Sequence, residues 1–330
     1  MNGRVQCVLC PHMCELAPGE RGRCTVRLNR DGELISLVYG RPVAVHVDPV
    51  EKKPLFHFMP GTDVFSIATA GCNLRCDFCQ NWEISQAAPE EVSPYHMPPE
   101  AVVERALEYR CGAVAYTYTE PIVCFEYTRD CARLAGESGL ANILVTAGYI
   151  NPGPLAELAP YIDAANVDLK SMSDSYYRNT CGGTLQPVLN AIDALKDSGT
   201  WVEITNLVVP TMNDSDDDTD NLASWVLNNA GAETPLHFSR FFPMYRMADL
   251  PPTPVDTLGR ARERALEMGL HHVYVGNAVT SDGMMTTCPR CGRTLIERHG
   301  YMVNSLRIRN GCCEYCSAPV AGIWNGTEDL

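Results

Sequence analysis

The chain has 330 residues, 20% of them charged, and a formal net charge of -14 at neutral pH. The length suits one large α/β domain with appendages, or two domains. The negative charge argues against general nucleic-acid binding, because phosphate contacts need a basic surface. The chain has sixteen cysteines and no stretch apolar enough to span a bilayer. Because cytoplasmic thiols stay reduced, we predict a cytoplasmic protein whose clustered cysteines bind metal.

The first cysteine-rich segment lies in residues 1–50, followed within that range by an expected strand over residues 33–39. Four cysteines and one histidine fall within eighteen positions, namely Cys7, Cys10, Cys14, Cys24 and His12. Zinc is the first choice of metal, because it needs no redox partner and tolerates irregular loops. A second iron–sulfur cluster is the alternative. We expect the histidine to lie beside the site rather than to bind the metal.

A strand-like run at residues 64–68 leads into a short loop with three cysteines, Cys72, Cys76 and Cys79. Thiolates are the usual ligands of iron–sulfur clusters, and a cubane normally takes four of them. Three ligands leave one iron open, and an open metal position can bind a chelating ligand. A zinc knuckle is the alternative, although zinc sites usually carry paired cysteines at both ends. The loop therefore favours a [4Fe-4S] cluster with one open iron.

This loop, with Phe78 before its third cysteine, resembles the signature of the radical S-adenosylmethionine (SAM) superfamily. The continuation Gln80-Asn81-Trp82 resembles its pyruvate formate-lyase activating-enzyme-like branch, and nearly the whole chain is similar to the radical SAM enzyme of AmmeMemoRadiSam systems. The resemblance implies that SAM chelates the open iron and that one electron from the cluster then cleaves the bound SAM. The product is a 5′-deoxyadenosyl radical, which abstracts hydrogen from a substrate. It also implies that Phe78 lies near the adenine, and it implies a low-oxygen setting.

Helix-like and strand-like stretches alternate between the loop and residue 285. Apolar runs predict strands at 113–116, 142–146, 164–169, 202–209 and 236–241, and a seventh is possible at 272–275. Intervening stretches predict helices at 99–110, 122–136, 154–158, 187–197, 217–229 and 255–268. The alternation favours a parallel sheet. For residues 51–285 the resemblance implies a partial (β/α)6 barrel of the TIM type, which periodicity alone does not distinguish from a doubly wound sheet.

In either arrangement, ligands bind beyond the C-terminal ends of the strands. The resemblance implies that polar side chains there contact SAM, and the candidates are Glu120, Thr146, Asn166, Asp168, Lys170, Thr205, Asn206 and His237. Glu120 matches the superfamily glutamate for the SAM amino group, although Tyr118-Thr119 replaces the two glycines that usually precede it. Asp168 and Lys170 alternate with apolar neighbours and share a face, where unpaired charges are costly, so a ligand role is favoured. A core histidine explains His237 equally well.

Three further features leave alternatives open. Lys52, Lys53 and His57 lie in a segment that resembles the one before the cluster loop in AmmeMemoRadiSam enzymes. They either face the active site or form a solvated turn with a packed histidine. The acidic run at residues 214–220 lacks the glycine and glutamate of a calcium loop and is expected to open a helix. Cys181, before two glycines, is a candidate for approaching a substrate.

The tail, residues 286–330, carries two cysteine pairs of matching spacing, Cys288 with Cys291 and Cys313 with Cys316. This pattern predicts a zinc ribbon. Structural zinc supplies about 10–16 kcal/mol of apparent binding energy, enough to fold an appendage that lacks a core of its own. Five arginines and two glutamates lie between the outer cysteines, so the tail is mildly basic. A structural cap is expected, and contact with a partner or RNA is the alternative.

The sequence therefore predicts a radical SAM enzyme with a [4Fe-4S] cluster, SAM and zinc as cofactors. Its substrate is either a glycyl-radical enzyme or a small molecule or peptide that it modifies with companion proteins of the AmmeMemoRadiSam system. We expect a ferredoxin or flavodoxin-like electron donor, and no membrane or general nucleic-acid partner. The alternative of another class is a metal-stabilised binding module that senses redox state or docks on RNA without SAM turnover.

Overall fold

The computed structural model describes residues 3–280 and 282–324. Residues 1–2 of the predicted N-terminal segment and residues 325–330 of the predicted tail domain lie outside this description. The centre is an eight-stranded sheet in the order β12-β11-β10-β9-β8-β7-β6-β5. Its strands are β5 (Ala44–Pro49), β6 (Asp63–Ala68), β7 (Ala113–Tyr116), β8 (Ala141–Thr146), β9 (Ala164–Asp168), β10 (Trp201–Val208), β11 (Leu236–Arg240) and β12 (Val273–Gly276). All neighbours from β6 to β12 pair in parallel, and β5 pairs antiparallel with β6.

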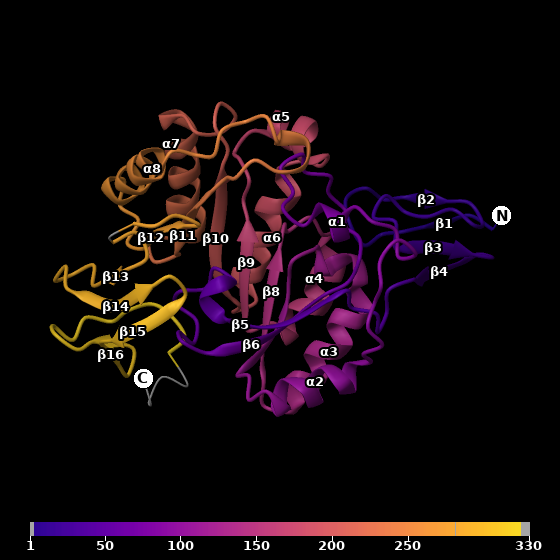
Figure 1. Ribbon diagram of the computed structural model, residues 1–330, viewed down its shortest axis with the longest axis horizontal. Helices are drawn as coiled ribbons and strands as arrows, with labels where there is room; N and C mark the ends of the chain where they lie inside the picture. The colour runs from indigo at the N-terminus through magenta and orange to yellow at the C-terminus, as the bar shows by residue number, and fades with distance from the viewer. Residues whose placement is uncertain (1–2, 281, 325–330) are drawn as a thin grey trace.

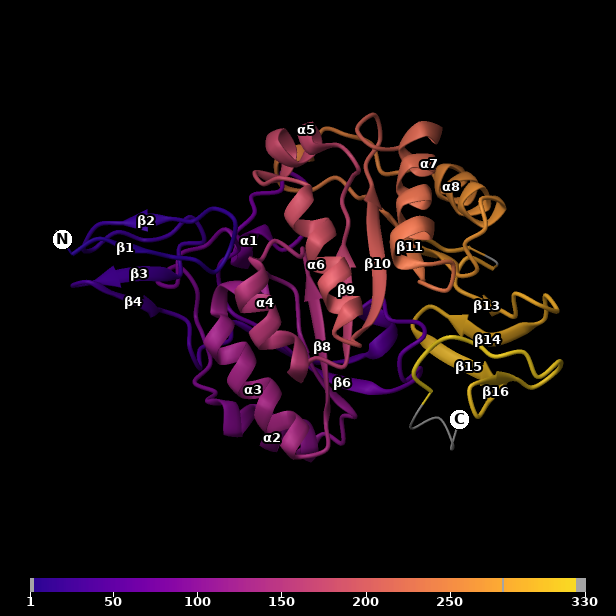
Figure 2. The same cartoon turned by 180° about the vertical axis from the view of Figure 1, so that it is seen from behind.

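Helices connect successive parallel strands, as the alternating pattern predicts. They are α2 (Pro99–Glu108), α3 (Phe125–Glu137), α4 (Pro152–Leu158), α6 (Gln186–Asp197), α7 (Asp216–Trp225) and α8 (Val255–Glu267). Helices α3, α4 and α6 lie in front of β8 and β9 in Figure 2, whereas Figure 1 shows the other face of these strands. The predicted strands and helices are confirmed to within a few residues, including the seventh parallel strand. The mostly parallel sheet is consistent with a radical SAM partial barrel.

Shorter turns of helix complete the core. They are α1 (Trp82–Ser85), α5 (Asp174–Tyr176), the 3-10 turns η1 (Val50–Lys52), η2 (Pro121–Cys124), η3 (Ala159–Tyr161) and η6 (Tyr245–Met247), and the π-helical turns η4 (Tyr177–Cys181) and η5 (Val226–Ala230). The acidic run opens α7, as expected. The Ser215 hydroxyl accepts from the Asp218 amide at 3.1 Å, and the Asp218 carboxylate accepts from the Ser215 amide at 3.3 Å. This reciprocal cap satisfies two donors that a helix start otherwise leaves unpaired.

The N-terminal segment and the tail lie at opposite ends of the molecule (Figure 1). The first contains two hairpins, β1 (Val5–Gln6) with β2 (Glu15–Leu16) and β3 (Arg27–Arg30) with β4 (Glu33–Ser36). The strand expected at residues 33–39 therefore ends at Ser36. Strand β5 was not predicted, because its proline-rich surroundings show no clear period. It joins the central sheet before the predicted boundary at residue 50.

The tail contains β13 (Thr286–Thr287), β14 (Thr294–His299), β15 (Met302–Leu306), β16 (Ile308–Arg309) and β17 (Cys312–Cys313). It has a small hydrophobic core of its own, which includes Leu295, Ile296 and Val320. Metal binding is therefore not its sole source of stability, which corrects the expectation that the appendage lacks a core. Within residues 3–280 and 282–324, no helix is long and apolar enough to cross a membrane.

Candidate active site

One cavity of about 550 Å³ lies where the parallel strands end and the cluster loop begins. It brings together most of the predicted site residues from six separate segments. Those that line it are Cys72, Cys76, Phe78, Cys79, Glu120, Thr146, Asp168, Lys170, Thr205 and His237. The rule that ligands bind beyond the C-terminal strand ends therefore located the cavity correctly.

Two predicted SAM contacts, Asn166 and Asn206, do not line this cavity. The Asn166 amide donates to the Pro54 carbonyl at 2.8 Å, and the Asn206 amide donates to the Leu169 carbonyl at 2.8 Å. Asn166 lies two residues before the end of β9, or roughly 6.6 Å deeper along the strand. Asn206 follows cavity-lining Thr205, and consecutive strand residues point to opposite faces. Both asparagines donate to backbone carbonyls, and their side chains lie outside the cavity.

The cluster loop is held in place by the chain on both sides of it. The Arg75 amide donates to the Cys181 carbonyl at 2.8 Å, and the Asp77 amide donates to the Thr180 carbonyl at 3.0 Å. Gly71 has a φ of +91°, and a Cβ at this position would lie 2.6 Å from the Cys24 carbonyl oxygen. Only glycine therefore permits the N-terminal segment to pack this closely against the loop. The three thiols are positioned by the fold.

The loop thiols differ in their electrostatic surroundings. Burial and the nearby Glu120 carboxylate raise the pKa of Cys72, and burial raises the pKa of Cys79. A hydrogen bond with the Cys181 thiol lowers the pKa of Cys76 despite its burial. Outside the tail, no set of three or more such ligands in the described chain has its donor atoms within 4.8 Å of one another. The loop thiols line one cavity but are not as closely spaced as the tail thiols, and a cluster would attach each of them to a different iron.

Glu120 lies fully buried above the loop, at the end of the segment that follows β7. Its Oε1 accepts from the Thr146 hydroxyl at 2.7 Å and the Ile122 amide at 3.2 Å, and its Oε2 accepts from the Ala147 amide at 2.8 Å. An ionised carboxylate has about four acceptor positions, so roughly one stays free for a ligand. Burial raises the pKa of Glu120, and a bound cation would favour its charged form.

Tyr118 adopts the backbone conformation that a glycine would take. Its φ of +65° lies in the left-handed region, and the Asn81 side-chain amide donates to its carbonyl at 2.7 Å. Its hydroxyl donates a hydrogen bond to Asp48, and the Lys53 ammonium lies 4.7 Å from its ring centroid. The turn before Glu120 is therefore formed without the superfamily's two glycines, at the cost of backbone strain.

The lysines before the loop and His57 have different environments. Lys52 lines the cavity, and its ammonium lies 2.8 Å from the Asp48 carboxylate. Lys53 is buried against the same carboxylate at 2.5 Å, and burial lowers its pKa to about 8. His57 does not line the cavity, and it bonds the Tyr274 hydroxyl at 2.6 Å. The packed-histidine alternative is therefore correct for His57, whereas Lys52 faces the cavity.

Asp168, Lys170 and Phe78 form one wall of the cavity. The Lys170 ammonium lies 3.0 Å from the Asp168 carboxylate and 5.7 Å from the Phe78 ring centroid. Burial lowers the pKa of Lys170, but the Asp168 charge and the Cys76 thiol outweigh it and hold the pKa well above its ordinary value. The ammonium is therefore charged, and the predicted shared face of Asp168 and Lys170 is confirmed.

Comparisons with known proteins identify the family. The sequence profile of the Radical SAM superfamily matches residues 66–223. An uncharacterized protein of Methanocaldococcus jannaschii, MJ0808, is 44% identical over 97% of this chain and 96% of its own length. The chain contains a Radical SAM superfamily domain. A pyruvate formate-lyase-activating enzyme of Clostridium pasteurianum is 26% identical over 49% of this radical SAM chain and 69% of its own.

A solved structure supports the fold. The crystal structure of a radical SAM methyltransferase from Sphaerobacter thermophilus aligns with a TM-score of 0.51 and 17% sequence identity. The alignment covers 72% of this chain and 71% of that one. The alignment supports the fold, whereas the family match and the activating-enzyme relatives support an enzyme of the radical SAM type.

Sequence reasoning missed the residue that positions His237 in this radical SAM enzyme. Glu203 on β10 is fully buried, and it accepts from His237 Nε2 at 2.6 Å. It also accepts from the amides of Phe56 at 3.0 Å and His57 at 2.7 Å. The only sequence signal was an acidic residue inside an apolar strand, because its partners lie far away in the chain.

The tail of the enzyme contributes both a cavity residue and the predicted zinc ligands. Tyr301 lines the cavity, which sequence reasoning did not anticipate. The donor atoms of Cys288, Cys291, Cys313 and Cys316 all lie within 4.8 Å of one another. The Cys288–Cys316 and Cys291–Cys313 sulfur distances are 3.6 and 3.8 Å. Tetrahedral zinc with 2.3 Å bonds places its sulfurs about 3.8 Å apart, so the residues fit zinc.

Proposed function

We propose that this radical SAM enzyme holds a [4Fe-4S] cluster on Cys72, Cys76 and Cys79 and cleaves SAM reductively to abstract hydrogen from a substrate. The observation that carries the proposal is that the three thiols converge on one cavity with the buried Glu120 carboxylate. When bound, the cluster supplies the electron that breaks the carbon–sulfur bond of SAM. The partial (β/α)6 barrel that we propose for residues 51–285 places these groups at its C-terminal mouth.

The residues of the chain bind and orient SAM in this proposal. Glu120 accepts a hydrogen bond from the SAM amino group at its remaining acceptor position, which matches a carboxylate with an ammonium. Phe78 offers its ring to the adenine. The Thr205 hydroxyl is buried and has no hydrogen-bond partner among the described residues, so a SAM hydroxyl would satisfy it. The half-exposed Asp168 carboxylate is a second acceptor on the same side.

Two substrate classes follow from the proposal. The similarity to pyruvate formate-lyase-activating enzymes supports a glycyl-radical enzyme, whose radical site would have to enter the cavity. A small molecule or peptide, modified together with companion proteins of an AmmeMemoRadiSam system, is supported by Tyr301, through which the tail lines the cavity. The proposed electron donor is of the ferredoxin or flavodoxin type. Sixteen unpaired thiols support a reducing, low-oxygen cytoplasm as the proposed setting.

The first test is anaerobic reconstitution with iron and sulfide, followed by SAM and a chemical reductant. We expect 5′-deoxyadenosine from the wild-type protein and none from Cys76→Ala. Cys111→Ala is the matched control, because this buried cysteine lies outside all three cysteine groups. Wild-type protein with a full complement of iron that releases no deoxyadenosine would overturn the proposal. It would favour the binding-module alternative, which predicts salt-sensitive RNA binding through the tail instead.

A second test separates the substrate classes. Incubation with a candidate glycyl-radical enzyme, SAM and reductant should produce a glycyl radical detectable by electron paramagnetic resonance if the first class is correct. Deuterium-labelled substrate offers a check for the second class. Small molecules or peptides that donate hydrogen transfer it to 5′-deoxyadenosine, so labelled substrate yields labelled deoxyadenosine, and an unlabelled product would exclude that substrate.

A further inference from the structure

A second cysteine site lies directly behind the cluster loop. Its hollow is lined by the four N-terminal cysteines and by His12, Arg27 and Asn73. Cys7 and Cys24 are buried, whereas Cys10 and Cys14 are partly exposed. The Cys7 amide donates to the Cys14 carbonyl at 2.9 Å, and the Met13 amide donates to the Cys10 carbonyl at 3.0 Å. The fold thus brings the four cysteines to one hollow.

The spacing of these thiols separates them from the tail site. The tail sulfurs lie within 4.8 Å of one another, as a single zinc ion requires, whereas the described N-terminal cysteines do not form such a group. The loop cysteines Cys72, Cys76 and Cys79 do not form such a group either. A cubane attaches each cysteine to a different iron and holds the sulfurs farther apart than one ion does. The four N-terminal cysteines share one hollow without the close spacing of the tail site, which favours an iron–sulfur cluster over a single zinc ion.

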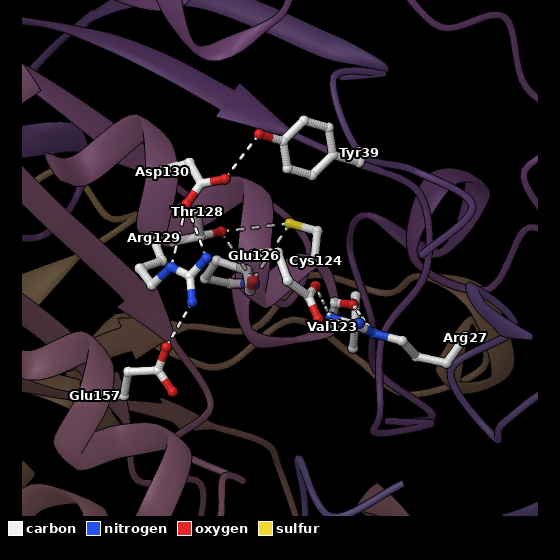
Figure 3. A network of polar contacts seen from close by, with 10 residues as sticks. Arg27, Tyr39, Val123, Cys124, Glu126, Thr128, Arg129, Asp130 and Glu157 are labelled. Atoms are coloured by element: carbon white, nitrogen blue, oxygen red, sulfur yellow. Dashed lines mark hydrogen bonds and ion pairs between the residues drawn. The ribbon is translucent and has the colours of Figure 1, made fainter. Parts of the chain in front are cut away.

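A buried cation stands beside the N-terminal thiols. The Arg27 side chain is buried and lines the same hollow as Cys7 and Cys24. Figure 3 shows how Arg27 is fixed: it donates to the Val123 carbonyl at 2.9 Å and to both Glu126 oxygens at 2.6 Å. A positive charge at this position stabilises thiolates and a cluster that carries them.

The site also contacts the cluster loop, and Asn73 is one of the residues that join them. Asn73 directly follows Cys72, and its carbonyl bonds His12 Nε2 at 2.7 Å. Its side-chain amide donates to the Tyr149 carbonyl at 2.7 Å, and the same side chain lies against Cys10. A guanidinium nitrogen of Arg75 in the loop also donates to the Arg23 carbonyl at 3.0 Å. The partly exposed N-terminal site is thus in direct contact with the deeper loop site.

We infer that Cys7, Cys10, Cys14 and Cys24 hold a second iron–sulfur cluster that passes single electrons to the cluster on the central loop. A low-potential donor protein of the ferredoxin or flavodoxin class loses one electron, the second cluster gains it, and it is reoxidised as it reduces the loop cluster. No proton or covalent bond changes in either transfer. The relay role rests on the proposed function, whereas the metal binding does not.

The test removes one cysteine group at a time and counts the metals. Reconstituted wild-type protein should hold roughly eight irons and roughly one zinc. The triple variant Cys72→Ala, Cys76→Ala, Cys79→Ala should keep roughly four irons, and its reduced paramagnetic signal should not respond to SAM. The quadruple variant Cys7→Ala, Cys10→Ala, Cys14→Ala, Cys24→Ala should also keep roughly four irons, with a signal that SAM perturbs.

Each outcome has a definite meaning. A triple variant without iron but with roughly two zincs per chain would overturn the inference in favour of zinc, and one with no added metal would overturn it as well. If one of the two variants aggregates, the other still tests the inference, because its iron content should be half that of wild type. Tail zinc of roughly one per chain serves as the check that a variant is folded. Absence of SAM cleavage at full iron content would contradict the proposed function but not the metal site on the N-terminal cysteines.

The relay is tested by the source of electrons. The quadruple variant should lose deoxyadenosine formation with reduced flavodoxin or ferredoxin, while a chemical reductant still reduces its loop cluster. Equal rates for the quadruple variant and wild type with the protein donor would contradict the relay and leave the metal site standing.

Discussion

A buried arginine joins each end of the molecule to segments around the central sheet, but the two arginines have different partners. At the N-terminus, Arg27 forms direct bonds of 2.6 Å to both oxygens of Glu126, whose side chain is 43% exposed. In the tail, Arg298 donates to the Phe56 carbonyl at 2.6 Å and to the Thr286 hydroxyl at 2.9 Å. Its carboxylate partner Glu51 is fully buried and 3.6 Å away.

The difference is visible in the pKa values of the four groups. Burial pushes the pKa of Glu126 upward, but its bonds to Arg27 outweigh burial and hold the pKa below its ordinary value. At the tail, burial dominates: it raises the pKa of Glu51 and lowers that of Arg298. The Arg27–Glu126 pair has direct bonds and a partly exposed carboxylate, so keeping both groups charged costs little free energy. The buried Arg298–Glu51 pair, 3.6 Å apart, keeps its charges at a large desolvation cost. We therefore expect the stability of the tail to depend on its zinc and on an intact Arg298–Glu51 pair more than the N-terminal segment depends on Arg27.

The largest expected effect is loss of the tail zinc. Cys291 is exposed, so Cys291→Ser removes a ligand without creating a cavity. Structural zinc contributes about 10–16 kcal/mol of apparent binding energy, so we expect loss of roughly one zinc per chain and local unfolding of residues 286–324. Metal analysis and amide hydrogen exchange measure both. Retained zinc and unchanged protection would contradict the assignment of Cys291 as a zinc ligand, and wild-type protein without zinc would show that the four cysteines are not a zinc site.

Next in size is removal of the tail arginine. Arg298→Met leaves the buried Glu51 carboxylate without its cation, which costs about 3–5 kcal/mol. The midpoint of urea unfolding should fall accordingly. The matched control is Arg298→Met with Glu51→Gln, which should recover part of the loss because no buried charge is stranded. A double variant no more stable than the single one would show that the charge pair is not the cause.

A smaller effect is expected at the other end. Arg27→Met removes bonds to a half-exposed carboxylate and to the Val123 carbonyl, which are worth about 1.5–3 kcal/mol. Water can solvate Glu126 afterwards, so the loss in unfolding free energy should be smaller than for Arg298→Met. Equal or greater destabilisation would contradict the contrast between the two arginines. Iron content of this variant should fall as well, if Arg27 supports the N-terminal thiolates.

The smallest effect is an opposite response of the two ends to acid. The folded pKa of Glu126 lies below 4.5, so its stabilisation is complete above about pH 4.5 and is lost as the pH falls through the lowered value. The folded pKa of Glu51 lies above 4.5, so acidification from neutral pH protonates it in the folded state first and stabilises that state. Glu51→Gln and Glu126→Gln, melted from pH 4 to 8, should therefore come closer to wild type near pH 4 and differ from it in opposite directions near pH 8, where Glu51→Gln should be more stable than wild type and Glu126→Gln less stable.

The sequence predicted the parts of the structure that depend on local pattern. Near-continuous apolar runs marked the parallel strands, because those strands are buried on both faces. Cysteine spacing marked the loop and the tail. The strand-end rule brought Lys170, Thr205 and His237 to one cavity although they lie far apart in the chain.

The missed features depend on tertiary contacts. Strand β5 is an edge strand whose pairing with β6 leaves no clean period in its own sequence. Glu203 accepts hydrogen bonds from Phe56, which lies far before it in the chain, and from His237, which lies after it. No local sequence pattern encodes these two contacts. Asn166 and Asn206 lie outside the cavity, because the depth of a residue along a strand and the face it is on decide which polar side chains line it.

The most direct test of the central assignment is magnetic coupling between SAM and the loop cluster. Reduced protein is mixed with SAM that carries nitrogen-15 in its amino group, and electron–nuclear double resonance is recorded on wild type and on the Cys72→Ala, Cys76→Ala, Cys79→Ala variant. A site on these three cysteines predicts a nitrogen-15 coupling in wild type that is absent in the variant. Wild-type protein with a full iron content and no such coupling would contradict it.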